Sequence, residues 1–116
     1  MLYAFSGRNE PDARFRCVEF QTGKIKWDRD ESWPPHSTPT PEVYGRGSAV
    51  LAESKLFVLG EGGLLGLFKA DPDKAQEISR SQIPQLQHPC WAAPVLSRRK
   101  LYLRGENQLV CLNVGR

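Results

Sequence analysis

An internal repeat with a period of 45 residues is the feature of this sequence that most constrains its fold. Two stretches of the chain align without gaps, from the pair Val50 and Val95 to the pair Leu67 and Leu112. A period between roughly 20 and 50 residues is typical of solenoids and propellers, in which each copy of one unit packs on its neighbours. The sequence therefore predicts a series of stacked repeats.

A third, less regular copy opens the chain. Leu2 to Phe5 corresponds to Leu101 to Arg104, and Arg16 to Glu19 corresponds to Val110 to Asn113. The first offset is 99 positions and the second is 94, so this copy holds five additional residues. We assign them to the polar stretch at 6–13, because a surface hairpin tolerates such an insertion.

Each copy alternates short apolar runs with turns. In the central copy these runs predict strands at 55–59 and 64–69, joined by a glycine-containing turn at 60–63. An additional outer strand is expected at 24–27 in the first copy and at 75–83 in the second, where polar and apolar residues alternate. Four strands in about 45 residues is the length of a propeller blade. The predicted fold class is therefore all-β, with antiparallel four-stranded blades in a partial β-propeller.

The expected organisation is one partial β-propeller domain over residues 1–116 with three, four and three strands in its copies, or about two and a half blades. Its parts are an incomplete first blade at 2–31, a proline-rich connector at 32–44, a second blade at 45–89 and an incomplete third blade at 90–114. So few blades cannot close a ring. We therefore expect a fragment, a piece of a larger assembly, or self-association that completes the ring.

The connector contains four prolines between Ser32 and Pro41, which excludes a regular strand or helix there. A polyproline ligand for an SH3-like partner is one interpretation. The position of the segment between two repeats favours the other, a loop that joins two blades.

The segment from Cys17 to Trp27 resembles the tryptophan-docking motif of the PQQ-like (quinoprotein) β-propeller repeat family. That motif has a small residue, an acidic or amide residue, Thr-Gly and a tryptophan at fixed spacing. The resemblance implies that Thr22 and Gly23 form the tight turn between the third and fourth strands. Trp27 would then stack on the turn of a neighbouring blade and serve packing between blades.

The segment from Cys90 to Asn113 is similar to the start of another blade of this family, so the resemblance extends from Leu2 to Val114. The central copy departs from the pattern, because Ala70 to Asp73 replaces the Thr-Gly turn and no tryptophan follows at the docking distance. Such degenerate repeats are most similar to the non-catalytic members of the family. They imply a binding or scaffold module with a protein or polymer partner and with no cofactor in this chain.

The alternative is a fragment of a PQQ-dependent alcohol or sugar dehydrogenase whose catalytic residues lie in other blades. Only this alternative brings in PQQ and Ca²⁺. The family's active sites also use two adjacent cysteines, and no Cys-Cys pair occurs in this sequence. Relatives of this repeat are usually exported, which implies a periplasmic or secreted location, although the chain shows no export signal of its own.

Cysteines and tryptophans supply the remaining candidate site residues. Cys17 and Cys111 occupy the same repeat position, and we expect both to be buried packing thiols. Cys90 is expected to be the thiol most free to react. Trp33, beside the prolines, is expected to be exposed and to contact a partner. For Trp91, the lining of a cofactor channel or of a sugar-binding groove is one interpretation, but its place at the entry to an inner strand favours packing in the core.

No residue is assigned as catalytic or as a metal ligand. Asp28, Asp30 and Glu31 form the densest acidic cluster, for which a solvated strand end beside Arg29 is favoured over a cation site. No two cysteines or histidines lie at the spacing of zinc ligands. The turn at 60–63 joins two strands and lacks a following helix, so we interpret it as a hairpin and not as a phosphate loop.

Charge and hydropathy argue against two classes of partner. Sixteen basic and 13 acidic residues give a net charge of +3 and form no basic block, so nucleic-acid binding is not expected. No apolar stretch approaches the roughly 20 residues of a membrane-spanning helix, so no transmembrane segment is expected.

Overall fold

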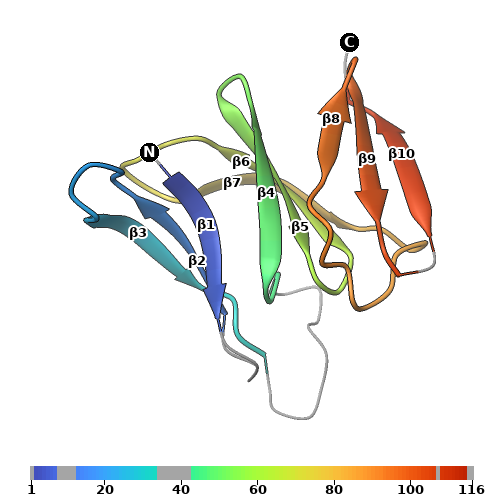
Figure 1. Ribbon diagram of the computed structural model, residues 1–116, viewed down its shortest axis with the longest axis horizontal. Helices are drawn as coiled ribbons and strands as arrows, with labels where there is room; N and C mark the ends of the chain where they lie inside the picture. Colours follow the sequence, from blue (N-terminus) through green and yellow to red (C-terminus); the bar gives the residue numbers. More distant parts are fainter. Residues whose placement is uncertain (1, 8–12, 34–42, 107, 115–116) are drawn as a thin grey trace.

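A computed structural model of the chain describes residues 2–7, 13–33, 43–106 and 108–114. These residues form ten β-strands in three antiparallel sheets of three, four and three strands, and none of them lies in a helix (Figure 1). The predicted all-β class, its antiparallel pairing and the expected strand numbers are confirmed. Within this described part, no helix exists that could cross a membrane.

The strands follow the order of the sequence within each sheet. The first sheet contains β1 (Leu2–Gly7), β2 (Ala13–Val18) and β3 (Ile25–Asp30); the second contains β4 (Gly47–Ala52), β5 (Lys55–Gly60), β6 (Leu64–Lys69) and β7 (Gln76–Gln82); the third contains β8 (Val95–Ser97), β9 (Lys100–Arg104) and β10 (Leu109–Asn113). The outer strand expected at 24–27 extends to Asp30, and the one expected at 75–83 is β7. Most of the proline-rich connector, including residues 34–42, lies outside the described residues.

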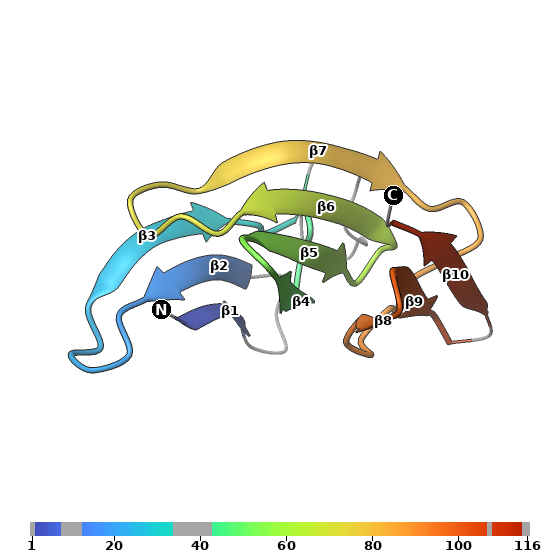
Figure 2. The ribbon, with the colours of Figure 1, turned by 90° about the horizontal axis from the view of Figure 1, so that it is seen from above.

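The three sheets lie side by side along an arc. β4 contacts β1 on one side and β8 on the other, so the first strands of the sheets are neighbours. Figure 2 shows these strands along one border of the arc and β3, β7 and β10 along the opposite border. The described sheets do not close into a ring.

Two hydrophobic cores hold the sheets together. The core between the first and second sheets is formed by Phe15, Tyr44, Leu56, Val58, Leu64 and Phe68. The core between the second and third sheets is formed by Leu59, Ile83, Leu86, Cys90, Leu101 and Leu103. Successive side chains of a strand point to opposite faces of the sheet. Because both faces of β5 are covered by a core, its sequence is one continuous apolar run.

Trp27 on β3 connects the first sheet to the second. Its indole N–H donates a 2.7 Å hydrogen bond to the backbone carbonyl of Asp71, which lies between β6 and β7. Its ring packs edge-on against Phe15, with 5.2 Å between the ring centroids. The turn before β3 is closed by a 2.8 Å bond from the Gly23 amide to the Glu19 carbonyl, with φ of +75° at Gly23.

The gapless 45-residue alignment is wrong in the third strand of each repeat. Leu67 pairs with Phe57 on β5, and the residue that pairs with the equivalent Tyr102 on β9 is Cys111, not Leu112. The turn between β9 and β10 is one residue shorter than the turn between β5 and β6, which changes the offset from 45 to 44. Leu112 consequently points into the second core.

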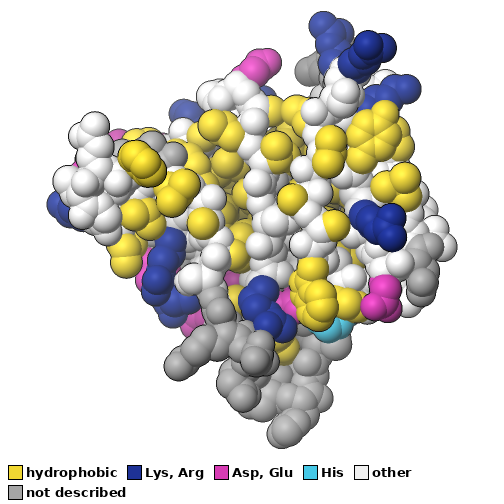
Figure 3. Space-filling model, viewed as in Figure 1, with side chains coloured by type: hydrophobic (Ala, Val, Ile, Leu, Met, Phe, Trp, Pro, Cys, Tyr) yellow, Lys and Arg dark blue, Asp and Glu magenta, His cyan; other side chains and the backbone are white. Residues whose placement is uncertain are grey.

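The third sheet presents an apolar face that no described residue covers. Val95 is 58% exposed and Leu109 is 66% exposed on this face. Their pairing partners make them equivalent to Val50 and Leu65 of the second sheet, which pack in the second core. Hydrophobic side chains are visible over this sheet in Figure 3.

Candidate functional site

A fully buried carboxylate, Glu61, lies in the turn between β5 and β6. It accepts hydrogen bonds from the backbone amide of Arg46 at 2.7 Å and from the indole N–H of Trp91 at 3.1 Å. The Nε atom of Arg46 lies 3.3 Å from this carboxylate, and Nε2 of His88 lies 3.1 Å from it. Glu61 therefore holds three side chains that come from two other segments.

The backbone of Glu61 joins the same segments. Its amide donates to the Tyr44 carbonyl at 3.1 Å, and its carbonyl accepts from the Cys90 amide at 2.7 Å. Gly60 makes this close approach possible, because a Cβ atom there would lie 2.5 Å from the Tyr44 carbonyl oxygen. At the other end of the turn, Gly63 adopts φ of +93°, a conformation that glycine tolerates best.

The ionised form of Glu61 is favoured in spite of its burial. Burial raises the pKa of this carboxyl, but hydrogen bonds from the Arg46 backbone, Trp91, the Arg46 side chain and His88 outweigh it and hold the pKa below its usual value. The site therefore contains a charged carboxylate at neutral pH, paired with the Arg46 guanidinium.

Arg46 also contacts two aromatic rings. Its guanidinium carbon lies 5.7 Å from the ring centroid of Trp33 and 5.9 Å from that of Trp91. His88 meets Trp91 edge-on, with centroids 6.2 Å apart. On the face of the molecule shown in Figure 3, a histidine lies at the lower edge beside hydrophobic, basic and acidic side chains. Trp91 is nevertheless 63% exposed, so its polar edge is anchored while its ring meets solvent.

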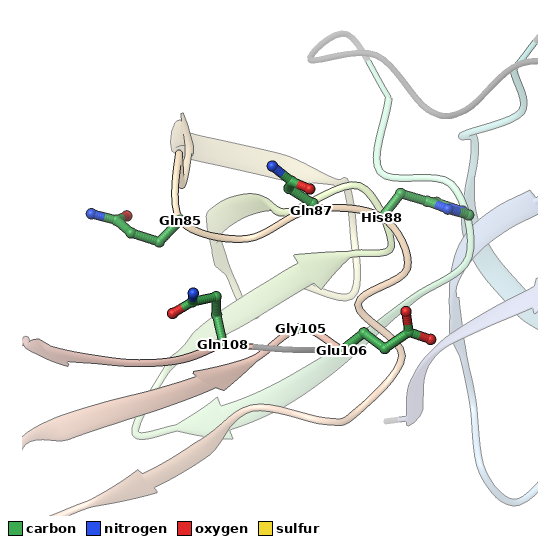
Figure 4. A pocket seen from close by; sticks show the side chains of 6 residues that line it. All are labelled: Gln85, Gln87, His88, Gly105, Glu106 and Gln108. Atoms are coloured by element: carbon green, nitrogen blue, oxygen red, sulfur yellow. The ribbon is translucent and has the colours of Figure 1, made fainter.

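Two adjoining hollows lie beside this cluster. One of about 290 Å³ is lined by Gln85, Gln87, His88, Gly105, Glu106 and Gln108. Figure 4 shows the segment with Gln85 and Gln87 facing the turn with Glu106 and Gln108 across this hollow. The other, of about 250 Å³, is lined by Pro89, Trp91, Ala92, Arg104, Gly105 and Glu106. Because they share Gly105 and Glu106, we treat them as one surface, the Trp91 groove.

The acidic cluster at the end of β3 does not converge on one point. Asp28 forms a 2.7 Å ion pair with Arg14, whereas Glu31 is buried and forms a 2.9 Å ion pair with Arg29. The expectation of a solvated strand end is therefore wrong for Glu31, whose carboxylate also accepts from the Tyr44 amide at 2.9 Å. Among the described residues, no three His, Cys, Asp or Glu side chains are grouped to hold a metal ion.

A second polar network fixes the first sheet to the second. The Tyr44 hydroxyl donates to Glu77 on β7 at 2.5 Å, and Arg80 forms a 2.7 Å ion pair with the same carboxylate. Burial, followed by the Glu77 carboxylate, raises the pKa of Tyr44 far above its usual value. Arg29 lies 3.5 Å from Glu77. These groups satisfy one another inside the fold, which indicates a structural role.

The residues of the docking motif lie where a turn and the following strand meet. The Thr22 hydroxyl donates to the Glu19 carboxylate at 2.5 Å and accepts from the Lys24 amide at 3.2 Å. Gly23 closes the turn, and Trp27 reaches Asp71 of the second sheet. Of these three residues, Trp27 contacts the second sheet, whereas Thr22 and Gly23 lie in an exposed turn of the first sheet.

Both expectations about the exposure of the other tryptophans are wrong. Trp33 is only 9% exposed, because its ring packs near the Arg46 guanidinium. Trp91 lies outside the core, because its indole N–H is drawn to Glu61 and its ring remains at the surface. The exposed tryptophan of the site is therefore Trp91.

Two of the three expectations about cysteines are also wrong. Cys17 is buried, as expected, and Cys111 is exposed because its face of the third sheet is not covered by any described residue. Cys90, expected to be reactive, is fully buried, and its thiol lies 3.2 Å from the Gln87 carbonyl. Burial raises the pKa of the Cys90 thiol, which makes it less reactive.

Sequence reasoning missed Glu61 and Arg46. Two signals were available: Glu61 recurs as Glu106 in the repeat, and Arg46 occupies the same repeat position as Trp91. A charged residue at a recurring hairpin position usually indicates a solvated turn. Here the segments that contain Arg46 and Trp91 pack over Glu61 and bury it, and the local sequence pattern does not predict this packing.

No protein-family model matches this chain, and no curated protein is significantly similar to it.

Proposed function

We propose that this chain is a non-catalytic binding module built from PQQ-like β-propeller repeats, and that it presents the Trp91 groove to a polymer or protein partner. One observation carries the proposal: Trp91 exposes its ring while its N–H is fixed to the buried Glu61 carboxylate. A rigid aromatic side chain at the surface offers large contact area at a low cost in conformational entropy. Such an arrangement suits recognition.

The repeat assignment is supported by how the sheets contact one another. Three sheets of similar strand order stack through hydrophobic cores on successive faces, which is how neighbouring blades pack. The bond from Trp27 to Asp71 lies at one such contact, where the family resemblance puts its docking tryptophan.

The groove offers binding groups more readily than catalytic ones. Among its described lining residues are three glutamine amides and one carboxylate, Glu106. Nucleophilic catalysis requires a nucleophile with an adjacent base, and general acid–base catalysis requires positioned groups near the reacting atoms. His88 is engaged with Glu61, and the nearby Cys90 thiol is buried.

The binding proposal is tested on an array that carries glycans and peptides. We expect the chain to bind at least one glycan or peptide on the array, and the Trp91→Ala variant to lose that binding. Phe20→Ala is the matched control, because Phe20 is 79% exposed in a turn remote from the groove in sequence. Retention by neither class, or equal retention of Trp91→Ala, would contradict the proposal.

The dehydrogenase alternative has a separate test. The chain is supplied with PQQ, Ca²⁺, an alcohol or sugar, and an artificial dye as electron acceptor. We expect no dye reduction above that of the reagents alone. Reduction that depends on the chain and on PQQ would favour the enzyme and exclude a purely non-catalytic role.

Self-association is a second candidate function, favoured by the uncovered face of the third sheet. Equivalent positions of the second sheet are covered by the next sheet, so a sheet from a second copy of this chain would continue the same stacking. We expect a dimer mass in light scattering, reduced to the monomer mass by Leu109→Asp and unchanged by Phe20→Asp. A monomer mass for the unmodified chain across a wide concentration range would exclude this role.

A further inference from the structure

We infer that the Trp91 groove binds a neutral, hydroxyl-rich glycan chain, with one sugar unit on the Trp91 ring and the next among the glutamines. This inference rests on the proposed binding function and names its ligand class. The two hollows adjoin at Glu106 and measure about 290 and 250 Å³. Small-molecule sites begin near 300 Å³, so each hollow suits one small unit of a polymer better than a large rigid ligand.

The polar lining matches hydroxyl groups. Each glutamine amide presents two N–H donors and a carbonyl acceptor, and a hydroxyl both donates and accepts. Gln85 and Gln87 lie on one side of the hollow and Gln108 lies on the other, as Figure 4 shows. A sugar unit between them can therefore exchange hydrogen bonds with both sides. Glu106, shared by the two hollows, supplies a further acceptor.

Trp91 supplies the apolar half of the site. A sugar ring has one face dominated by C–H groups, and such a face packs on the electron-rich face of an aromatic ring. The indole of Trp91 is held by Glu61 at its N–H and flanked edge-on by His88. The ring is thus presented in a fixed orientation before a ligand arrives, which lowers the entropy lost on binding.

Local charge favours an uncharged ligand. The Arg46 guanidinium is paired with Glu61, and the two charged residues of the second hollow, Arg104 and Glu106, are of opposite sign. A phosphate-rich polymer requires several lysines or arginines along its path. The groove lacks such a row among its described lining residues, so we expect binding that is nearly independent of salt.

The test uses soluble neutral oligosaccharides of about three to six units, titrated calorimetrically into the full chain. Glucose-based, mannose-based and N-acetylglucosamine-based series serve as probes, with polygalacturonate and proline-rich peptides for comparison. We expect one neutral series to bind, with affinity changing less than about threefold between roughly 0.05 and 0.5 M salt.

Three variants assign the binding to the groove. Trp91→Ala should weaken binding at least about tenfold, and Gln108→Ala should weaken it by about three- to tenfold. Trp91→Phe keeps an aromatic face without the N–H and should retain more affinity than Trp91→Ala. Phe20→Ala should bind normally. Urea unfolding of each variant establishes that it is folded.

The outcomes separate this inference from the function on which it rests. Binding of a peptide through Trp91 with no binding of any neutral oligosaccharide overturns the glycan inference and leaves the binding module standing. Binding of polygalacturonate alone, or glycan binding that Trp91→Ala does not weaken, overturns the inference as well. No binding of any probe contradicts both.

Discussion

The indole N–H of Trp91 donates a 3.1 Å hydrogen bond to Oε1 of Glu61, so a residue that is 63% exposed is fixed by one that is fully buried. The same carboxylate contacts Arg46, in the segment before β4, and His88, in the segment after β7. The geometry of the surface groove is therefore set by a charge inside the fold. Changes at Glu61 should affect stability and binding together.

Replacing Glu61 by Gln should destabilise the fold. The glutamine side chain keeps one oxygen acceptor, but its NH₂ group would face the N–H groups that now donate to Glu61. The substitution also removes the negative charge that pairs with Arg46. Loss of charged, buried hydrogen bonds costs about 1.5–3 kcal/mol, which we expect as the decrease in the free energy of unfolding in urea. Glu106→Gln, at the equivalent and exposed repeat position, should change it by less than about 0.5 kcal/mol. Equal effects of the two substitutions would contradict the role of Glu61.

The same carboxylate predicts how stability depends on pH. Its pKa in the folded chain lies below that in the unfolded chain, so the unfolded chain binds the proton more readily. The stabilisation is present above the unfolded pKa, near 4.3, and is lost as the pH falls through the lower folded pKa. The stability difference between the unmodified chain and Glu61→Gln should therefore shrink as the pH falls below about 5. A difference that stays constant down to the acid unfolding limit would be evidence against this linkage.

Trp27→Phe tests the connection between the first two sheets. The substitution keeps a ring near Phe15 but removes the N–H that bonds the Asp71 carbonyl, so we expect a loss of about 1–2 kcal/mol. Trp27→Ala also removes the packing and should cost about 3–5 kcal/mol. Urea unfolding provides both values, with Phe20→Ala as the exposed aromatic control. A cost for Trp27→Phe no larger than that of the control would show that the bond contributes nothing to stability.

Local pattern was sufficient to predict the strands, because alternation and turn residues act over a few positions. The apolar runs around Leu56 and Leu101 predict the strands that the structure contains, whereas the turn at Gly23 follows from the family resemblance. Local pattern does not predict the pairing register of the third strand. The gapless repeat alignment misses that the turn before Leu109 is one residue shorter than the turn between β5 and β6. The pairing of Tyr102 with Cys111 in the structure gives the correct register of this strand.

The exposure of single side chains was predicted less well, because it depends on which segments meet across sheets. Its place before an inner strand predicts that Trp91 lies in the core, yet a carboxylate 30 positions earlier holds its N–H. Cys17 and Cys111 share one repeat position, but only Cys17 has a sheet packed over its face. The repeat position of a residue determines which face of its sheet the side chain lies on. Whether that side chain is buried depends on whether another sheet packs on that face.

Thiol labelling should separate the three cysteines. Cys111 is exposed, whereas Cys17 and Cys90 are buried and burial raises the pKa of both thiols. We expect one equivalent of a thiol reagent to react rapidly and the other two only on unfolding, as followed by intact mass and peptide mapping. Cys111→Ser should abolish the rapid phase. Rapid labelling of Cys90 would instead mean that the segment after Gln87 opens readily.

Gly66→Ala tests how tightly Tyr44 is packed against β6. A Cβ atom at Gly66 would overlap the Tyr44 hydroxyl, which is buried and donates to Glu77. Tyr44 would have to move, so the substitution should cost about 1–3 kcal/mol from overpacking and a similar amount from the disturbed hydrogen bond. Tyr44→Phe removes the same hydroxyl, and the double variant should therefore lose less stability than the sum of the two single losses in urea unfolding. Strict additivity would mean that the two residues act independently, contrary to their contact.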